Sequence, residues 1–270
     1  MEYVLSLSYG KDSLACLGAI ERLGWPLDRI IHAEVWATNA IPADLPPMVE
    51  FKKKADSVIK ERYGIEVEHF RADCSYEDVF YRKLKTSRRK EFPVRSIYGF
   101  PFQKGPWCNS RLKMAAIKKA QNMSAGAMQI IGIAADEQKR IERHKTNPNI
   151  LLPLVECGWT EQDCWDWCQE NDLLSPTYTT AARGGCWFCH NQGVDQLRLL
   201  RHNYPELWHL LLKWDVDSPV PFKADGHTVH DYDRRFQLED EGMVPNGKTF
   251  RWDMLDNPPG TQLSLFQEGL

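Results

Sequence analysis

No stretch of the 270-residue chain approaches the roughly 20 consecutive apolar residues that span a bilayer. The chain also lacks a basic leader with a cleavage site, so we expect a cytoplasmic protein that does not enter a membrane. Neither sign of charge is in excess, because 34 Lys and Arg stand against 37 Asp and Glu, for a net charge of -3. We therefore expect any anion-binding site to be a local feature of the surface.

Glycine and proline are not in excess either, because their 17 and 16 residues correspond to ordinary globular usage, which excludes a collagen-like chain and bulk disorder. The length is sufficient for one large domain, or for a domain with an appendage, to bury a core without disulfide staples. Eight cysteines are nevertheless present, and in a reducing compartment they favour metal ligation or catalysis over disulfides.

The first half of the chain alternates short apolar runs with helix-like segments. Residues 3–8 are β-prone, a glycine turn follows, and a helix-like pattern over residues 13–23 is closed by Gly24 and Pro26. Further strand-like runs cover residues 30–36, 66–70 and 128–133, and further helix-like segments cover residues 46–63 and 111–122. Strands that alternate with helices predict a parallel sheet covered on both faces.

The alternation of strand-like and helix-like segments ends after Leu151. Thr160, with Asp163 three residues later, predicts the start of a helix that runs to about residue 171. An amphipathic helical pattern covers residues 195–214 with an interruption at Pro205, and the remainder is loop-rich with a disordered tail over the last dozen residues. We predict two parts, residues 1–194 and residues 195–270. A structural polar loop is expected at His227, His230, Asp231 and Asp233.

Residues 8–13, Ser-Tyr-Gly-Lys-Asp-Ser, lie where a parallel sheet presents the end of a strand to the start of a helix. Unpaired backbone N–H groups and the positive end of the helix dipole suit a phosphate there. Gly10 lets the backbone approach a ligand, Lys11 adds a positive charge, and Ser8 and Ser13 can donate hydrogen bonds. An ordinary strand-to-helix turn with a capping serine explains the composition about as well.

The arrangement Ser-x-Gly-Lys-Asp-Ser resembles the PP-loop of the ATP pyrophosphatase superfamily, and the Walker A spacing is absent. Three later segments resemble the phosphoadenosine phosphosulfate reductase branch of that superfamily. They are residues 107–113 (Trp-Cys-Asn-Ser-Arg-Leu-Lys), residues 132–137 (Gly-Ile-Ala-Ala-Asp-Glu) with Arg140 and Arg143, and residues 152–165, which contain Leu-Pro-Leu and Trp-Thr-Glu-Gln-Asp-Cys-Trp. The order of the four matches along the chain is what favours the resemblance.

The resemblance implies a Rossmann-like, adenine nucleotide alpha hydrolase-like fold with a parallel five-stranded sheet and a small, mostly helical C-terminal part. It also implies binding of ATP or an adenosine phosphosulfate, with cleavage at the α-phosphorus. Carboxylates that suit Mg²⁺ are Asp12, Asp136 and Glu137, although such residues also cap helices. The expected catalytic residues are Lys11, Asp12 and Arg140. The expected nucleotide-binding residues are Ser8, Tyr9, Gly10, Lys11, Asp12, Ser13, Gly132, Asp136 and Glu137.

Two departures from the reductase pattern redirect the functional prediction. Ala134 stands where the branch has an arginine, and no cysteine follows Cys189, whereas the reductases carry a nucleophilic cysteine near the C-terminus. We therefore expect a PP-loop enzyme of sulfur metabolism that transfers sulfur. The alternatives are a phosphosulfate reductase proper and a nucleotide-binding regulatory or defence module with a structural zinc.

Cys186 and Cys189 are spaced so that both thiolates can face one ion, and Gly184 and Gly185 free the backbone around them. With His190 the pattern also matches a c-type haem attachment, and a thioredoxin-like pair is a further alternative. In the resembling enzymes a cysteine placed like Cys108 joins such a pair, which implies a [4Fe-4S] cluster on three thiolates. Zinc and unligated thiols stay open, and the other five cysteines are interpreted as core or incidental residues.

Residues 82–104 form a local basic segment in a nearly neutral chain. It contains eight Lys or Arg and a single acidic residue, Glu91, and Tyr81, Phe92 and Tyr98 could stack on bases. A nucleic-acid backbone or the phosphates of a nucleotide would suit this segment, and a solvated charge run is the alternative. The oligomeric state stays open, with a homodimer as one candidate.

Overall fold

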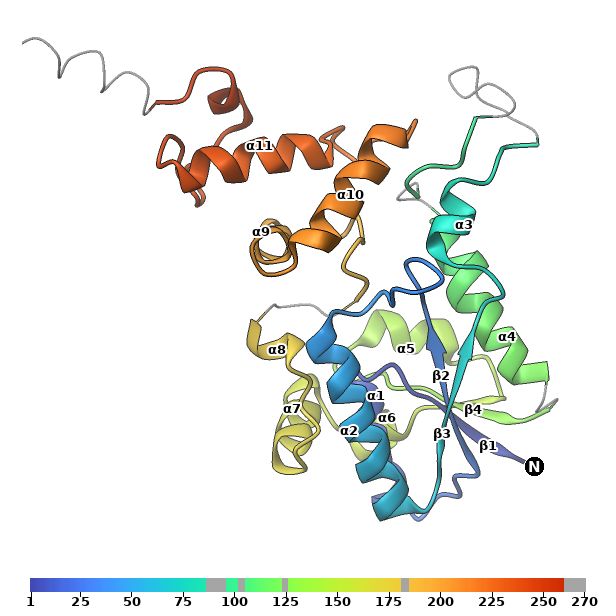
Figure 1. The fold of residues 1–270 in the computed structure, drawn as a ribbon. Coiled ribbons are helices and arrows are strands. Elements are labelled where there is room, and N and C mark those ends of the chain that lie inside the picture. Colours follow the sequence, from blue (N-terminus) through green and yellow to red (C-terminus); the bar gives the residue numbers. More distant parts are fainter. Residues whose placement is uncertain (86–95, 102–104, 123–125, 181–184, 260–270) are drawn as a thin grey trace, which may run out of the picture. The chain divides into compact units, whose positions relative to one another are not determined.

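Five strands within the first 151 residues form one parallel sheet, in the order β3-β2-β1-β4-β5 (Figure 1). The computed structural model describes residues 1–85, 96–101, 105–122, 126–180 and 185–259. The strands are β1 (Tyr3–Ser6), β2 (Arg29–Glu34), β3 (Val67–Arg71), β4 (Met128–Ile130) and β5 (Ile150–Leu151). The predicted Rossmann-like α/β fold with a five-stranded parallel sheet is confirmed.

The chain divides into two compact units. Unit 1 comprises Met1–Val79 and Pro106–Trp187, and unit 2 comprises Phe80–Gly105 and Phe188–Leu270. The helices that lie wholly in unit 1 are α1 (Lys11–Leu23), α2 (Pro46–Tyr63), the π-helix η1 (Asn109–Lys113), α4 (Met114–Asn122), α5 (Gln138–His144), α6 (Pro153–Cys157), α7 (Glu161–Glu170) and α8 (Thr177–Thr180). The domain boundary suggested between residues 194 and 195 stays a prediction.

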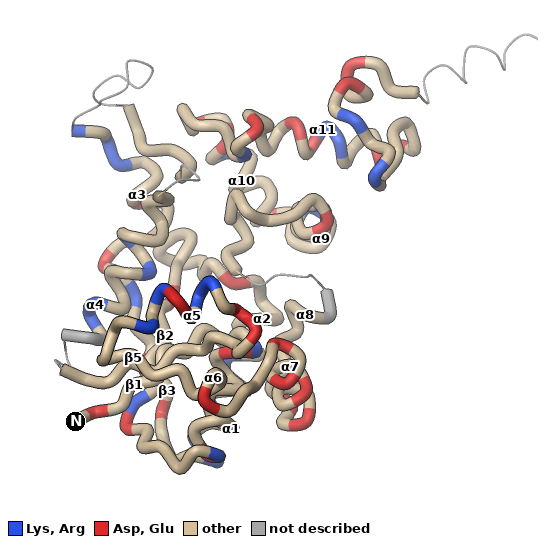
Figure 2. The backbone as a smooth tube through the Cα atoms, turned by 180° about the vertical axis from the view of Figure 1, so that it is seen from behind, with Lys and Arg blue, Asp and Glu red and all other residues tan. Residues whose placement is uncertain are grey.

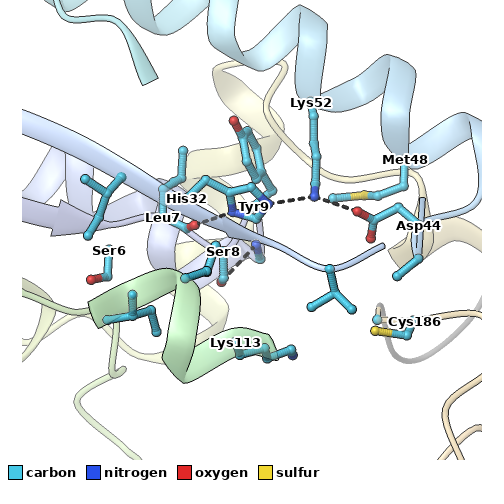
Figure 3. Close-up of a pocket in the computed structure, with 18 of the residues that line it drawn as sticks. Ser6, Leu7, Ser8, Tyr9, His32, Asp44, Met48, Lys52, Lys113 and Cys186 are labelled. Atoms are coloured by element: carbon cyan, nitrogen blue, oxygen red, sulfur yellow. Dashed lines mark hydrogen bonds and ion pairs between the residues drawn. The ribbon is translucent and has the colours of Figure 1, made fainter. Parts of the chain in front are cut away.

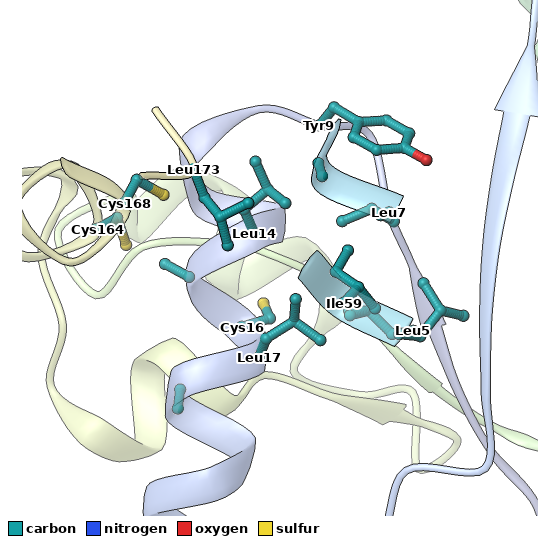
Figure 4. Close-up of a cluster of buried hydrophobic side chains, with 14 of the residues drawn as sticks. Leu5, Leu7, Tyr9, Leu14, Cys16, Leu17, Ile59, Cys164, Cys168 and Leu173 are labelled. Atoms are coloured by element: carbon teal, nitrogen blue, oxygen red, sulfur yellow. The ribbon is translucent and has the colours of Figure 1, made fainter. Parts of the chain in front are cut away.

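Alternate residues of the central strands face opposite helical layers of unit 1. Leu5 and Ile30 pack in one buried cluster with residues of α1, α2 and α7, part of which Figure 4 shows. Val4 and Ile31 pack on the other face with Ala120 of α4. This two-residue alternation between two apolar faces is the pattern of a parallel sheet covered on both sides.

Local signals place most of the helix ends. Gly24 ends α1 in the left-handed conformation with φ of 63°, and Pro46 begins α2. Thr160 and Asp163 form the predicted capping box at the start of α7. The helix expected over residues 111–122 begins instead as the five-residue π-helix η1, which runs into α4.

Unit 2 contains α9 (Val194–Asn203), α10 (Pro205–Asp217), α11 (Val229–Asp240) and the 3₁₀ helix η2 (Trp252–Leu255). The short helix α3 (Tyr76–Phe80) ends at the first residue of this unit. An aromatic cluster ties Phe80 and Phe100 to the C-terminal helices, with ring centroids of Phe80 and Trp214 5.8 Å apart. No helix among the described residues is long and apolar enough to cross a membrane.

The polar loop expected at His227 to Asp233 is wrong, because His230, Asp231 and Asp233 belong to helix α11. The side chain of Thr228 accepts a hydrogen bond from the Asp231 amide, and the Asp231 carboxylate accepts one from Thr228 in return. This capping box has the same form as the one at Thr160, so the signal was present in the sequence. The expected disordered tail lies outside the described residues.

Candidate nucleotide-binding site

The loop of residues 8–13 leaves the carboxyl edge of β1 and enters helix α1. Gly10 is the N-cap of α1 in an extended conformation, and no side chain caps the helix. Among the described residues the amides of Asp12 and Ser13 make no hydrogen bond, as expected for the first turn of a helix. These two donors and the helix dipole make the turn suitable for an anion.

The other polar groups of the loop bond within unit 1. The Ser8 amide donates to Ser13 Oγ at 3.1 Å, and Ser13 Oγ donates to the Gly10 carbonyl at 2.9 Å. The Lys11 amide donates to the hydroxyl of Tyr178 on α8 at 3.1 Å. The two serines therefore shape the turn, and their predicted contact with a phosphate stays a prediction.

Gly132, which follows β4, lies directly against the start of α1. A Cβ atom at this position would come within 2.7 Å of the Asp12 carbonyl and of the Ser13 amide nitrogen. Only glycine lets the backbone after β4 pack this closely on the first turn of α1, so Gly132 supports the shape of the turn, and its predicted contact with a nucleotide stays a prediction. The structure thus brings Gly132 and the loop together.

A cavity of about 720 Å³ opens beside the loop, and all the residues that line it belong to unit 1. Of the residues predicted from the sequence, Ser8, Tyr9, Gly10, Lys11, Glu137 and Cys186 line the cavity. Figure 3 shows Ser8, Lys113 and Cys186 around the same space. Lys113, which precedes α4, lies in a segment that carried the resemblance but was not among the predicted site residues.

The Lys11 side chain is held by two carboxylates. Its ammonium lies 2.6 Å from Asp12 and 3.1 Å from Glu161 of α7. Burial alone would lower the pKa of Lys11, but the hydrogen bonds and charges of Asp12 and Glu161 outweigh it and raise the pKa. Figure 2 shows α7 with acidic positions only, whereas the charged positions of α4 are basic.

The remaining predicted carboxylates and the arginine have partners of their own. Glu137 pairs with Arg140 at 2.6 Å, and its carboxylate also accepts from the Ala134 amide at 3.3 Å. Asp136 accepts from the Glu161 amide at 3.2 Å and so caps the start of α7. Among the described residues Asp136 and Arg140 do not line the cavity. Their predicted roles with Mg²⁺ and phosphate stay predictions.

The predicted metal ligands are less buried than the cysteines of the core. Cys108 directly precedes η1, Cys186 lines the cavity, and Cys189 belongs to unit 2; all three are half-buried and free of disulfides. Cys164 and Cys168 are instead fully buried, and burial raises the pKa of each thiol to about 12. The three-thiolate site stays a prediction, whereas Cys164 and Cys168 are the expected core residues.

Sequence reasoning missed a buried polar chain behind the loop, which Figure 3 shows in part. His32 Nδ1 donates to the Leu7 carbonyl at 2.7 Å, and Lys52 donates to His32 Nε2 at 2.8 Å and to Asp44 at 2.6 Å. Burial, followed by the charge of Lys52, lowers the pKa of His32 to about 4, so the ring is neutral. Lys52 lies on the same face of α2 as Met48 and Ala55, and a lysine on an apolar face is a signal that could have revealed it.

A second chain of polar side chains, which is partly exposed, holds the buried Tyr9. The hydroxyl of Tyr9 donates to Asp56 of α2 and lies 3.2 Å from His69 Nε2. His69 bonds Asp56 at 3.0 Å and Glu34 at 2.8 Å, and these two carboxylates raise the pKa of His69 to about 9. The hydrogen bond from His69 is the largest of the effects that lower the pKa of Glu34 to about 2.

His32, Glu34 and His69 lie close enough together to suggest a metal site, with ligand atoms within 4.8 Å of one another. However, both nitrogens of each imidazole already have hydrogen-bond partners. The Lys52 ammonium also lies 2.8 Å from His32 and would repel a cation. The cluster is therefore a hydrogen-bonded framework under the loop.

The basic segment of residues 82–104 falls entirely within the first range of unit 2, Phe80–Gly105. Residues 86–95 and 102–104 lie outside the described residues, and they include five of the eight basic side chains: Arg88, Arg89, Lys90, Arg95 and Lys104. The prediction of nucleic-acid binding by this segment is therefore neither supported nor opposed.

No protein-family model and no curated protein sequence matches the chain. One solved structure that it is similar to is the U34-tRNA thiolase NcsA from Methanococcus maripaludis with its [4Fe-4S] cluster. The identity is 14% over 88% of this chain and 72% of the thiolase chain, with a TM-score of 0.37. At this level the likeness is no guide to activity.

Proposed function

We propose that the protein is a PP-loop enzyme that binds ATP, or an adenosine phosphosulfate, at residues 8–13 and cleaves it at the α-phosphate. The observation that supports this proposal is the start of α1, where the Asp12 and Ser13 amides have no hydrogen-bond partner among the described residues and the preceding Gly10 and Lys11 line the cavity. A diphosphate group would accept from both amides and be stabilised by the helix dipole.

The charges around the cavity suit the departure of pyrophosphate. Negative charge that develops on the leaving group would be stabilised by the fixed amides and by the ammonium of Lys11. Lys113 lines the same cavity and has no ion-pair partner among the described residues, so it offers a second cation. Asp12, which pairs with Lys11, and Glu137, which lines the cavity, are carboxylates that would suit Mg²⁺.

We further propose that Cys108, Cys186 and Cys189 hold a [4Fe-4S] cluster. The donor set fits, because three soft thiolate ligands suit iron–sulfur chemistry and all three thiols are only half-buried. When bound, such a cluster would supply a site that carries the sulfur to be transferred. Cys186 supports this placement because it lines the cavity that contains the loop.

The nucleotide part of the proposal is tested by ATP-dependent release of pyrophosphate. Asp12→Ala should abolish release, since it removes both a partner of Lys11 and a ligand for Mg²⁺. Asp166→Ala on α7 is the matched control, because within the described part of the chain Asp166 bonds only to Gln162 of its own helix. Release at the unaltered rate in Asp12→Ala would contradict the proposal.

The cluster is tested by iron and sulfide analysis after anaerobic purification. A brown protein with absorbance near roughly 400 nm is expected, and Cys186→Ser should lose it. Cys157→Ser on α6 is the matched control, since Cys157 is half-buried and donates to the Ala19 carbonyl of the same unit. A colourless zinc protein would contradict sulfur transfer and favour a nucleotide-binding module.

A further inference from the structure

Tyr9 has a backbone conformation that is unusual for a residue with a side chain. Its φ of 57° lies in the left-handed region, which tyrosine avoids unless its surroundings hold it there. Tyr9 is also fully buried, although its neighbours Ser8 and Gly10 are not, and all three line the cavity. The phenol therefore points under the loop while the backbone stays at the cavity.

The buried phenol is bound by three different elements of unit 1. Its hydroxyl donates to Asp56 of α2 and contacts His69 of β3, and His69 is bound in turn by Glu34 of β2 at 2.8 Å. The edge of the Tyr9 ring packs against His32, with ring centroids 4.7 Å apart. A side chain with this many partners cannot turn without breaking a charged network.

We propose that Tyr9 is a positioning residue for the phosphate loop. Its anchored phenol holds residue 9 in the left-handed conformation, and this turn sets the direction of the backbone as it enters α1. The unpartnered amides of Asp12 and Ser13 are thereby presented to the pyrophosphate part of a nucleotide before it binds. The inference rests on the proposed function for the identity of the ligand, and on the geometry for the role of Tyr9.

The neighbouring polar chain supports this role independently. His32 donates to the Leu7 carbonyl, so the residues on both sides of Ser8 are fixed from below. Lys52 keeps the other His32 nitrogen occupied and is itself held by Asp44. A loop held at two points loses less conformational freedom when a ligand binds, and this favours affinity.

The test compares two tyrosines that each lose a hydroxyl. Tyr9→Phe removes the anchor and keeps the ring, whereas Tyr63→Phe removes a buried hydroxyl that makes no hydrogen bond among the described residues. Tyr63 lies on α2, the same helix as Asp56. We expect Tyr9→Phe to weaken the affinity for ATP and for inorganic pyrophosphate about tenfold, measured by calorimetry. Tyr63→Phe should leave both affinities unchanged.

A double-mutant cycle separates positioning from general stability. Glycine adopts the left-handed region without an anchor, so Asp56→Asn should weaken pyrophosphate binding in the wild type but have no effect in a Tyr9→Gly background. An equal effect of Asp56→Asn in both backgrounds would overturn the proposal. If Tyr9→Phe does not fold, Asp56→Asn in the wild type replaces it, and its affinity for pyrophosphate is compared with that of Tyr63→Phe.

Hydrogen exchange of the loop amides in ligand-free protein keeps this inference distinct from the proposed function. Faster exchange at residues 10–13 in Tyr9→Phe would support the role of Tyr9, whatever the ligand. If the wild type bound neither ATP nor pyrophosphate, the proposed function would be overturned while this role remained supported. Unchanged exchange and unchanged ATP affinity in Tyr9→Phe would overturn the role of Tyr9 and leave the proposed function intact.

Discussion

The loop of residues 8–13 is held in different ways at residue 9 and at residue 11. Tyr9 is fully buried and bonds to a network of Asp56, His69 and Glu34 in which each member has a partner. Lys11 bonds instead to Asp12 and to Glu161, whose side chain is 55% exposed. The Tyr9 hydroxyl is thus bonded away from solvent, whereas one of the two carboxylates that hold Lys11 is exposed.

The difference matters because buried and exposed polar contacts respond differently to a ligand. The Tyr9 hydroxyl is buried, so breaking its bond to Asp56 would leave it unpaired away from water, and the Tyr9 side is expected to stay unchanged when a nucleotide binds. An exposed ion pair contributes little, so Lys11 can leave Glu161 for a phosphate at small cost. The loop thus combines a rigid backbone with an exchangeable cation.

The largest effect is expected where the backbone itself is crowded. Gly132→Ala would force a methyl group within 2.7 Å of the Asp12–Ser13 peptide, so the start of α1 must shift. We expect a loss of about 1–3 kcal/mol in the free energy of unfolding, measured in urea, together with a loss of ATP binding of more than about tenfold. Gly247→Ala is the control, because no atom lies within 4 Å of its Cβ position. Equal behaviour of the two variants would show that Gly132 does not support the loop.

The Tyr9 side should make stability depend on pH. The pKa of His69 is about 9 in the folded protein, above its ordinary value, so its contribution is complete below about pH 6.5 and is lost as the pH rises through 9. The pKa of Glu34 is about 2, so its contribution is complete above about pH 4.5 and is lost as the pH falls towards 2.

Urea unfolding at pH 6.5 and at pH 9 measures the alkaline limb. We expect the wild type to lose more free energy of unfolding between these two pH values than His69→Gln loses. His32, with its pKa lowered to about 4, is neutral across this range and does not contribute to it. The same pH dependence in wild type and variant would contradict the charged state assigned to His69.

A smaller effect is expected at the exchangeable cation. Glu161→Gln should release Lys11 from one carboxylate and tighten ATP binding about two- to fivefold, with little change in stability. Glu170→Gln on the same helix has no hydrogen bond or ion pair among the described residues and should leave the affinity unchanged. Weaker binding by Glu161→Gln, measured by calorimetry, would show that Glu161 contacts the ligand or its cation.

The sheet and the helix ends were predictable because their signals are local. Apolar runs marked the first four strands, and Thr160 and Pro46 marked helix starts. β5 was not predicted as a strand, because its two residues are too short for periodicity to show. Helix α11 was missed although Thr228 and Asp231 repeat the capping signal of α7, since the polar residues around them suggested a loop.

The site was predictable only in its sequence-contiguous part. The loop of residues 8–13 and the approach of Gly132 follow from motif and order along the chain. The bonds from Tyr9 to Asp56 and His69 join residues 47 and 60 positions apart, so no local pattern reveals them. Glu161 was part of a recognised segment, but its contact with Lys11 depends on how α7 packs against α1.

The central claim is tested most directly by a crystal structure of the protein with α,β-methylene ATP, which cannot be cleaved at the α-phosphate. We predict phosphate oxygens within about 3 Å of the amides of Asp12 and Ser13, with Lys11 moved from Glu161 to the phosphates and Tyr9 still in the left-handed conformation. A nucleotide bound away from residues 8–13, or a loop that rearranges with Tyr9 out of its network, would contradict the account.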